Sequence, residues 1–261
     1  MNIIVCVKQV PDTAEVRIDP VKKTLIRDGV PSIINPDDKN ALEAALKIKD
    51  ADKDVKITVV CMGPPPAEVA LREALAMGAD EAYLVSGREY GGSDTWATSN
   101  IISEAIKYIG NYDIVFCGRQ AIDGDTAQVG PQIAERLDLP QITYVQDIKM
   151  DGDKITVQRA LEDGYQVISV KTPCLLTCIK ELNEPRYASI PGIYTAYQKE
   201  VKVLSQNELN IPADRIGLTS SPTNVHDTFT AETKGAGVVL TGSEKEVAVA
   251  LVENLKAKHV I

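Results

Sequence analysis

"DIVFCGRQAIDGDTAQVGPQIAERL", residues 113–137, contains the transition that decides the fold. Its first six residues form a short and nearly continuous apolar run, which is typical of a buried parallel strand. Its last part predicts a helix, in which Pro131 is comfortable only near the start. The segment therefore predicts a strand that passes through a polar loop into a helix.

The loop of this segment predicts an anion site. A helix N-terminus presents free backbone N–H groups and a partial positive charge, both of which suit a phosphate. We expect the phosphate to be held by N–H groups in residues 124–127, by the Thr126 hydroxyl and by Arg119. The alternative is a well-capped helix without a ligand, since neither the G-x-G-x-x-G nor the P-loop spacing is present.

The two aspartates of the loop have local uses. Asp125 and Gln128 have the spacing of a capping box, and Asp123 before Gly124 suits a turn. Two carboxylates close to a phosphate would repel it. We therefore expect both aspartates to face away from the phosphate or toward a ribose.

The chain before this segment alternates between strand and helix patterns. Short β-rich runs occupy residues 2–7, 55–61 and 81–86. Helical patterns occupy residues 37–50, 65–78 and 94–110. Repeated alternation of this kind predicts an α/β fold with a doubly wound, mostly parallel sheet.

The carboxyl ends of three predicted strands carry polar, glycine or proline residues. They read CVKQVPDT (6–13), CMGPPP (61–66) and CGRQAIDGDTAQVG (117–130). Open parallel sheets bind ligands beyond the carboxyl ends of their strands. We therefore expect the ligand site at this edge.

The pattern changes after residue 140. Residues 142–180 contain β-like runs with turn signals at Asp151-Gly152 and Asp163-Gly164, so we expect antiparallel strands that extend the sheet. Residues 183–200 form an apolar loop, which either packs on its own domain or docks another protein. We place the α/β domain at residues 1–225.

Residues 226–261 predict a C-terminal arm that ends in an amphipathic helix, residues 243–258. Val247, Leu251 and Leu255 form its apolar line. The arm either wraps a partner or folds back on its own domain.

Composition excludes several classes of function. The net charge of −9 argues against a broad nucleic-acid surface, and no apolar run is long enough for a membrane span. The N-terminus lacks the pattern of a signal peptide, so we expect a cytoplasmic protein. The five cysteines are scattered, and their spacing does not predict a metal site.

Six ordered motifs carry a family resemblance. They are VKQVPDT (7–13), INPDDKNALEAAL (34–46), ALAMGAD (74–80), GRQAIDGDTAQVGPQ (118–132), VQRALEDGYQVISVKTPCLLT (157–177) and NEPRYASIPGI (183–193). Together the motifs resemble the beta subunit of electron transfer flavoprotein over nearly the whole chain. The resemblance implies a Rossmann-like, adenine-nucleotide-binding fold and a heterodimer with an alpha subunit that carries its own FAD, the C-terminal arm contacting that subunit.

The resemblance also implies site residues. The cofactor-binding residues carried over by motif are Cys6, Asn35, Pro36, Asp37, Asp38, Cys61, Gly118, Arg119, Gln120, Ala121, Ile122, Asp123, Gly124, Asp125, Thr126, Ala127, Gln128 and Val129. The residues implied to dock an acyl-CoA dehydrogenase are Tyr187, Ile190, Pro191 and Ile193. No side chain is implied to be catalytic, because the flavin carries the chemistry.

Two branches of the family differ in the ligand of this subunit. The motifs NPDDKNALEAAL and DGDTAQVGP resemble the electron-bifurcating, NADH-linked branch, which holds FAD. In that branch electrons from NADH reach a high-potential flavin of the partner and a low-potential acceptor such as ferredoxin or flavodoxin. The alternative is a non-bifurcating subunit with structural AMP. An ATP-hydrolysing or sensing protein is a remote third reading, since no P-loop motif follows the first strand.

Overall fold

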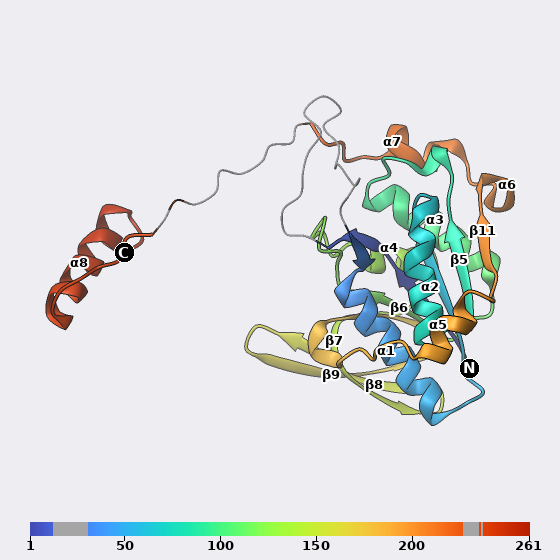
Figure 1. The fold of residues 1–261 in the computed structure, drawn as a ribbon. Helices are drawn as coiled ribbons and strands as arrows, with labels where there is room; N and C mark the ends of the chain where they lie inside the picture. The colour runs from blue at the N-terminus through green and yellow to red at the C-terminus, as the bar shows by residue number, and fades with distance from the viewer. Residues whose placement is uncertain (13–30, 227–234, 236) are drawn as a thin grey trace.

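The computed structural model describes residues 1–12, 31–226, 235 and 237–261. Within these residues the main sheet has nine strands, in the order β11-β5-β4-β1-β6-β10-β7-β8-β9 (Figure 1). In chain order they are β1 (Asn2–Val7), β4 (Lys56–Met62), β5 (Glu81–Val85), β6 (Ile114–Gly118), β7 (Gln141–Asp151), β8 (Lys154–Leu161), β9 (Gly164–Lys171), β10 (Cys174–Cys178) and β11 (Val201–Leu204). Neighbours from β11 to β7 are parallel, whereas β7, β8 and β9 are antiparallel. The predicted α/β fold with an antiparallel extension is therefore confirmed.

Helices cover both faces of the sheet. The helices of these two layers are α1 (Pro36–Ala51), α2 (Glu68–Met77), α3 (Thr95–Ile109), α4 (Val129–Arg136) and α5 (Ile190–Ala196). Alternate residues of β1 enter different cores, because successive side chains of a strand point to opposite faces. Ile3 and Val5 pack with α1, α2 and α5, whereas Ile4 and Cys6 pack with α3 and α4.

Local signals explain where the predicted helices begin and end. The Asp94 carboxylate accepts a hydrogen bond from the Ala97 amide at 3.0 Å and caps α3. Gly78 ends α2 with a φ of +131°, a conformation that other residues rarely adopt. The helices predicted around residues 37–50, 65–78 and 94–110 are confirmed within one or two residues at most ends, with residues 65–67 forming a 3-10 turn.

Two strands differ from the sequence-based expectation. β10 is parallel to both of its neighbours, β6 and β7, so the prediction of antiparallel strands is wrong for it. All five of its residues are buried, which is typical of a strand inside a parallel sheet. β11 was not predicted; it follows the loop expected over residues 183–200 and adds to the other edge of the sheet beside β5.

Shorter elements complete the α/β body. They are β2 (Gln9–Pro11), β3 (Ser32–Ile34), η1 (Pro65–Ala67), η2 (Arg88–Tyr90), η3 (Lys180–Leu182), α6 (Gln206–Leu209), η4 (Ala213–Arg215) and α7 (Gly217–Ser220). β2 and β3 pair as a small antiparallel ladder next to the end of β1.

The predicted C-terminal helix is α8 (Glu244–Ala257), which has no buried side chain. The Ser243 hydroxyl and amide both donate to the Glu246 carboxylate at the start of α8. Figure 1 shows α8 away from the sheet and its covering helices. None of the helices in the described part of the chain is both long enough and apolar enough to cross a membrane.

Candidate nucleotide site

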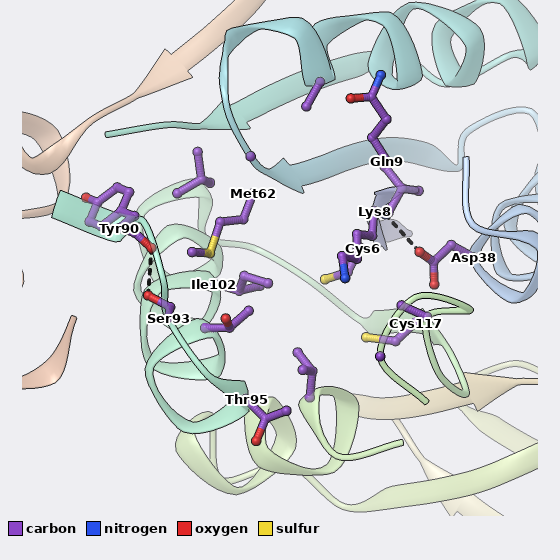
Figure 2. A pocket seen from close by; sticks show the side chains of 18 of the residues that line it. Cys6, Lys8, Gln9, Asp38, Met62, Tyr90, Ser93, Thr95, Ile102 and Cys117 are labelled. Carbon is purple, nitrogen blue, oxygen red and sulfur yellow. Dashed lines mark hydrogen bonds between the residues drawn. The ribbon is translucent and has the colours of Figure 1, made fainter. Parts of the chain in front are cut away.

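A cavity of about 1150 Å³ opens beyond the carboxyl ends of β1, β4, β5 and β6 (Figure 2). The chain proceeds from β1 to β4 and β5 on one side of β1, and then crosses to β6 on the other side. Ligands of doubly wound sheets bind at this kind of switch point. Cys6 and Cys117, from the ends of β1 and β6, both line the cavity.

The loop before α4 forms one wall and offers donors for an anion. The amides of Thr126, Ala127 and Gln128 donate to no acceptor among the described residues. Ala127 has a φ of +52°, and Gln128, which follows it, is right-handed. Successive residues of opposite hand form a backbone nest that binds anions. A left-handed alanine costs about 1–2 kcal/mol, and strain of this kind is concentrated at functional sites.

The capping box predicted for this loop is wrong. α4 begins at Val129, with Gln128 as its N-cap and no side-chain cap bond. The Asp125 carboxylate instead accepts a hydrogen bond from Gln120 Nε2 at 2.7 Å. Asp125 precedes the N-cap by three residues and has a left-handed backbone, with a φ of +49°, so it does not cap the helix.

Predicted ligands outside the cavity brace this loop. The amides of Gly124 and Asp125 both donate to the Ala121 carbonyl, which closes the expected turn. Asp123 faces away from the cavity and pairs with Lys8, whose Nζ lies 2.6 Å from Asp123 Oδ1. Asn35 binds the loop twice, donating to the Gln120 carbonyl at 2.8 Å and accepting from the Ile122 amide at 3.0 Å. These contacts fix the loop without a ligand.

Asp38 joins the ends of β1 and β6. Its two carboxylate oxygens accept from the Lys8 amide at 2.8 Å and from the Gly118 amide at 3.0 Å. A Cβ on Gly118 would lie 2.2 Å from Asp38 Oδ1, so only glycine permits this contact. Burial raises the pKa of Asp38 to about 7, although its hydrogen bonds oppose the shift.

The opposite wall was missed by the sequence analysis. It consists of Met62 at the end of β4, of the segment that follows β4, and of the segment after β5, which includes Tyr90 and Ser93 (Figure 2). The start of α3 completes it, with Thr95 and Ile102 facing the same space. The glycine-rich run SGREYGGSDT (86–95), directly after a predicted strand, was the signal that could have identified this wall.

The structure divides the predicted cofactor residues into two groups. Those that line the cavity are Cys6, Asp38, Gly118, Arg119, Gln120, Ala121, Gly124, Asp125, Thr126, Ala127, Gln128 and Val129. Those that do not line it are Asn35, Pro36, Asp37, Cys61, Ile122 and Asp123. Cys61 lies in the core of the other face of the sheet, because it is out of phase with Cys6. Binding by these residues stays a prediction.

The segment predicted to dock a partner is α5 and the residues before it. Tyr187 is 96% exposed and Ile190 is 84% exposed, whereas Ala196 on the opposite side of α5 is buried. At Gly192 the helix approaches α2 so closely that a Cβ would lie 2.3 Å from the Ala76 carbonyl oxygen. An exposed apolar surface on a tightly packed helix suits docking of another protein.

Comparisons with known proteins agree with this architecture. Residues 22–209 match the family described as electron transfer flavoprotein domain. The chain is 63% identical over 262 residues to electron transfer flavoprotein subunit beta of Thermoanaerobacterium thermosaccharolyticum. It is 55% identical over 262 residues to caffeyl-CoA reductase-Etf complex subunit CarD of Acetobacterium woodii, and 54% identical over 269 residues to acryloyl-CoA reductase electron transfer subunit gamma of Anaerotignum propionicum. In all three cases the match covers 100% of both chains.

Proposed function

The chain belongs to the electron transfer flavoprotein beta subunit family, and on that premise we propose that it binds FAD and takes part in electron bifurcation. As a heterodimer with an alpha subunit it passes electrons from NADH to an acyl-CoA dehydrogenase and to ferredoxin or flavodoxin. The observation that carries the FAD part of the proposal is the size and place of the cavity.

The cavity volume favours a dinucleotide over a mononucleotide. Small-molecule sites typically measure roughly 300–1000 Å³. The cavity here measures about 1150 Å³ and extends from the end of β5 to the loop after β6. AMP would fill only part of that space.

The residues of the cavity fit the parts of FAD. The amides of residues 126–128, which donate to no acceptor among the described residues, suit a phosphate, and Arg119 and the Asp123-paired Lys8 also line the cavity. Met62, Ile102 and the buried Tyr90 offer apolar surface for a flat ring. FAD, when bound, accepts a hydride and releases electrons singly. The residues of this chain hold it, orient it and exclude water from it.

The partners follow from the names of two relatives. One is named for caffeyl-CoA reductase and the other for acryloyl-CoA reductase. Both names support a dehydrogenase that acts on an acyl-CoA. We place its docking site on Tyr187, Ile190, Pro191 and Ile193.

Two contacts hold this docking surface in place. The Arg72 guanidinium donates to the Ala196 carbonyl at 2.7 Å, which ties the end of α5 to α2. Arg186 Nε lies 2.8 Å from the buried Glu43 carboxylate of α1, ahead of α5. A surface fixed from both sides loses little conformational entropy on binding.

We propose that the arm of this chain, residues 226–261, contacts the alpha subunit. None of the side chains of α8 is buried, and Leu251 is 48% exposed and Val249 51% exposed. An amphipathic helix needs a partner for its apolar side, and a second subunit supplies one.

The test is the nucleotide content of the heterodimer, measured by acid release and chromatography. Two FAD and no AMP per heterodimer support the proposal. One FAD with one AMP would reduce this chain to a structural and docking subunit and overturn the bifurcating assignment.

A matched pair of variants locates the second nucleotide. Ala127→Val places a β-branched residue in the left-handed nest, so the heterodimer should lose one nucleotide and keep that of the alpha subunit. Asp138→Val places the same residue at a φ of +53°, away from the cavity, and should keep both. Equal nucleotide content in the two variants would argue against this site.

A further inference from the structure

Tyr144 has an unusual backbone next to the nucleotide site. Its φ is +58°, a left-handed conformation that is a real outlier for a bulky aromatic residue. The pairing of β7 with β10 shifts here, since Ile142 is opposite Leu176 but Val145 is opposite Cys178. The strand therefore bulges at Tyr144. Bulges next to active sites commonly re-aim a side chain.

Tight packing holds the bulge. The Tyr144 amide donates to the Thr177 hydroxyl at 3.3 Å. Thr177 is buried under α4, where a Cβ on Gly130 would lie 2.7 Å from its methyl group. The bulge is thus determined by the surrounding structure, because Tyr144 gains nothing locally from a left-handed backbone.

The re-aimed ring contacts Arg119. The guanidinium carbon of Arg119 lies 5.8 Å from the centre of the Tyr144 ring, within cation–π range. Arg119 Nε also lies 3.4 Å from Asp37 Oδ2. Both of these buried atoms lack a hydrogen-bond partner among the described residues. Arg119 is therefore held by the charge of Asp37 and by the face of the Tyr144 ring, and its Nε–H group is not used in a hydrogen bond to any described residue.

Strain is concentrated around this arginine. In the described part of the chain, most non-glycine residues at positive φ are Asn or Asp, which tolerate it. Ala127 and Tyr144 are exceptions, and Ala127 lines the same cavity as Arg119. The strained backbone thus occurs at the nest and at the residue that contacts Arg119.

We infer that Tyr144 is a positioning residue that orients Arg119 to bind the phosphate part of the nucleotide. This inference rests on the proposed nucleotide site and adds the group that fixes its arginine. Guanidinium N–H groups match phosphate oxygens in geometry, provided that the guanidinium plane is held in place. The Tyr144 ring and the Asp37 carboxylate both hold that plane.

The experiment compares AMP with adenosine, because only AMP carries the phosphate. Calorimetric titration of the nucleotide-free full chain gives both dissociation constants. Arg119→Gln should raise the dissociation constant of AMP about tenfold, since it removes one charged contact. It should leave the dissociation constant of adenosine within about twofold of the wild-type value. Tyr144→Gly should weaken AMP about fivefold, although glycine suits a φ of +58°. Tyr144→Phe keeps the ring and should restore AMP affinity.

The double variant separates positioning from general support of the fold. If Tyr144 acts through Arg119, Arg119→Gln with Tyr144→Gly binds AMP no more weakly than Arg119→Gln alone. Three results would overturn the inference and leave the nucleotide site intact. They are wild-type AMP affinity in Tyr144→Gly, equal losses of affinity for AMP and for adenosine, and losses of AMP affinity that multiply in the double variant. A wild-type chain that binds neither molecule would overturn the proposed function and this inference with it.

Discussion

Asp38→Asn should remove a pH dependence from the stability of the protein. Asp38 is buried, and its carboxylate bridges the Lys8 and Gly118 amides at the ends of β1 and β6. Burial raises its pKa from the ordinary 3.8 to about 7. The folded state therefore binds a proton more tightly than the unfolded state between these two values. Ionisation of Asp38 then lowers the free energy of unfolding.

The magnitude follows from the size of the shift. Each pKa unit is worth about 1.4 kcal/mol, so ionised Asp38 costs about 4 kcal/mol of stability above pH 7. The cost disappears as the pH falls from 7 toward 4. Between pH 5 and pH 8 the change is about 3 kcal/mol. Asparagine cannot ionise; its amide nitrogen cannot accept the second backbone hydrogen bond, and that loss lowers stability equally at every pH.

Urea unfolding at pH 5, 6, 7 and 8 measures this effect. We expect the unfolding free energy of Asp38→Asn, measured relative to that of the wild type, to rise by about 3 kcal/mol from pH 5 to pH 8. Asp50→Asn is the control, because Arg186 lowers the pKa of Asp50 and leaves it ionised throughout this range. A difference between wild type and Asp38→Asn that does not vary with pH would refute the reasoning.

Three other substitutions test contacts around the site. Ala127→Gly relieves a left-handed alanine, so unfolding free energy should rise by up to about 1 kcal/mol with nucleotide affinity unchanged; weaker binding would mean that the methyl group touches the ligand. Glu43→Gln removes the buried charge opposite Arg186 and should cost about 1–3 kcal/mol in urea unfolding, and no loss would show that the pair is not stabilising. Gly192→Ala places a Cβ against the Ala76 carbonyl and should raise the KM for the acceptor dehydrogenase at unchanged flavin content, whereas an unchanged KM would argue against docking at α5.

Local patterns in the sequence predicted most of the architecture. Short apolar runs and helical periodicity located β1, β4, β5 and β6 and the helices between them. The rule that parallel sheets bind ligands at their carboxyl edge placed the cavity correctly, because it depends only on the direction of the strands. The same reasoning did not identify β10 as parallel or find β11, since neighbouring strands in a sheet are determined by contacts distant in sequence.

The sequence by itself determined the family, the order of the main strands and helices up to β6, and the polar loop after β6. Only the tertiary structure decided which side of the sheet each residue of that loop and of the strand ends faces. Asn35 and Asp123 face away from the cavity and brace the loop, and Asp38 turns its carboxylate to two amides. Tyr144 reaches Arg119 through a bulge that its own sequence does not favour. These roles depend on long-range packing, because strand register and the space between helices determine where a side chain can point, and a linear pattern carries neither.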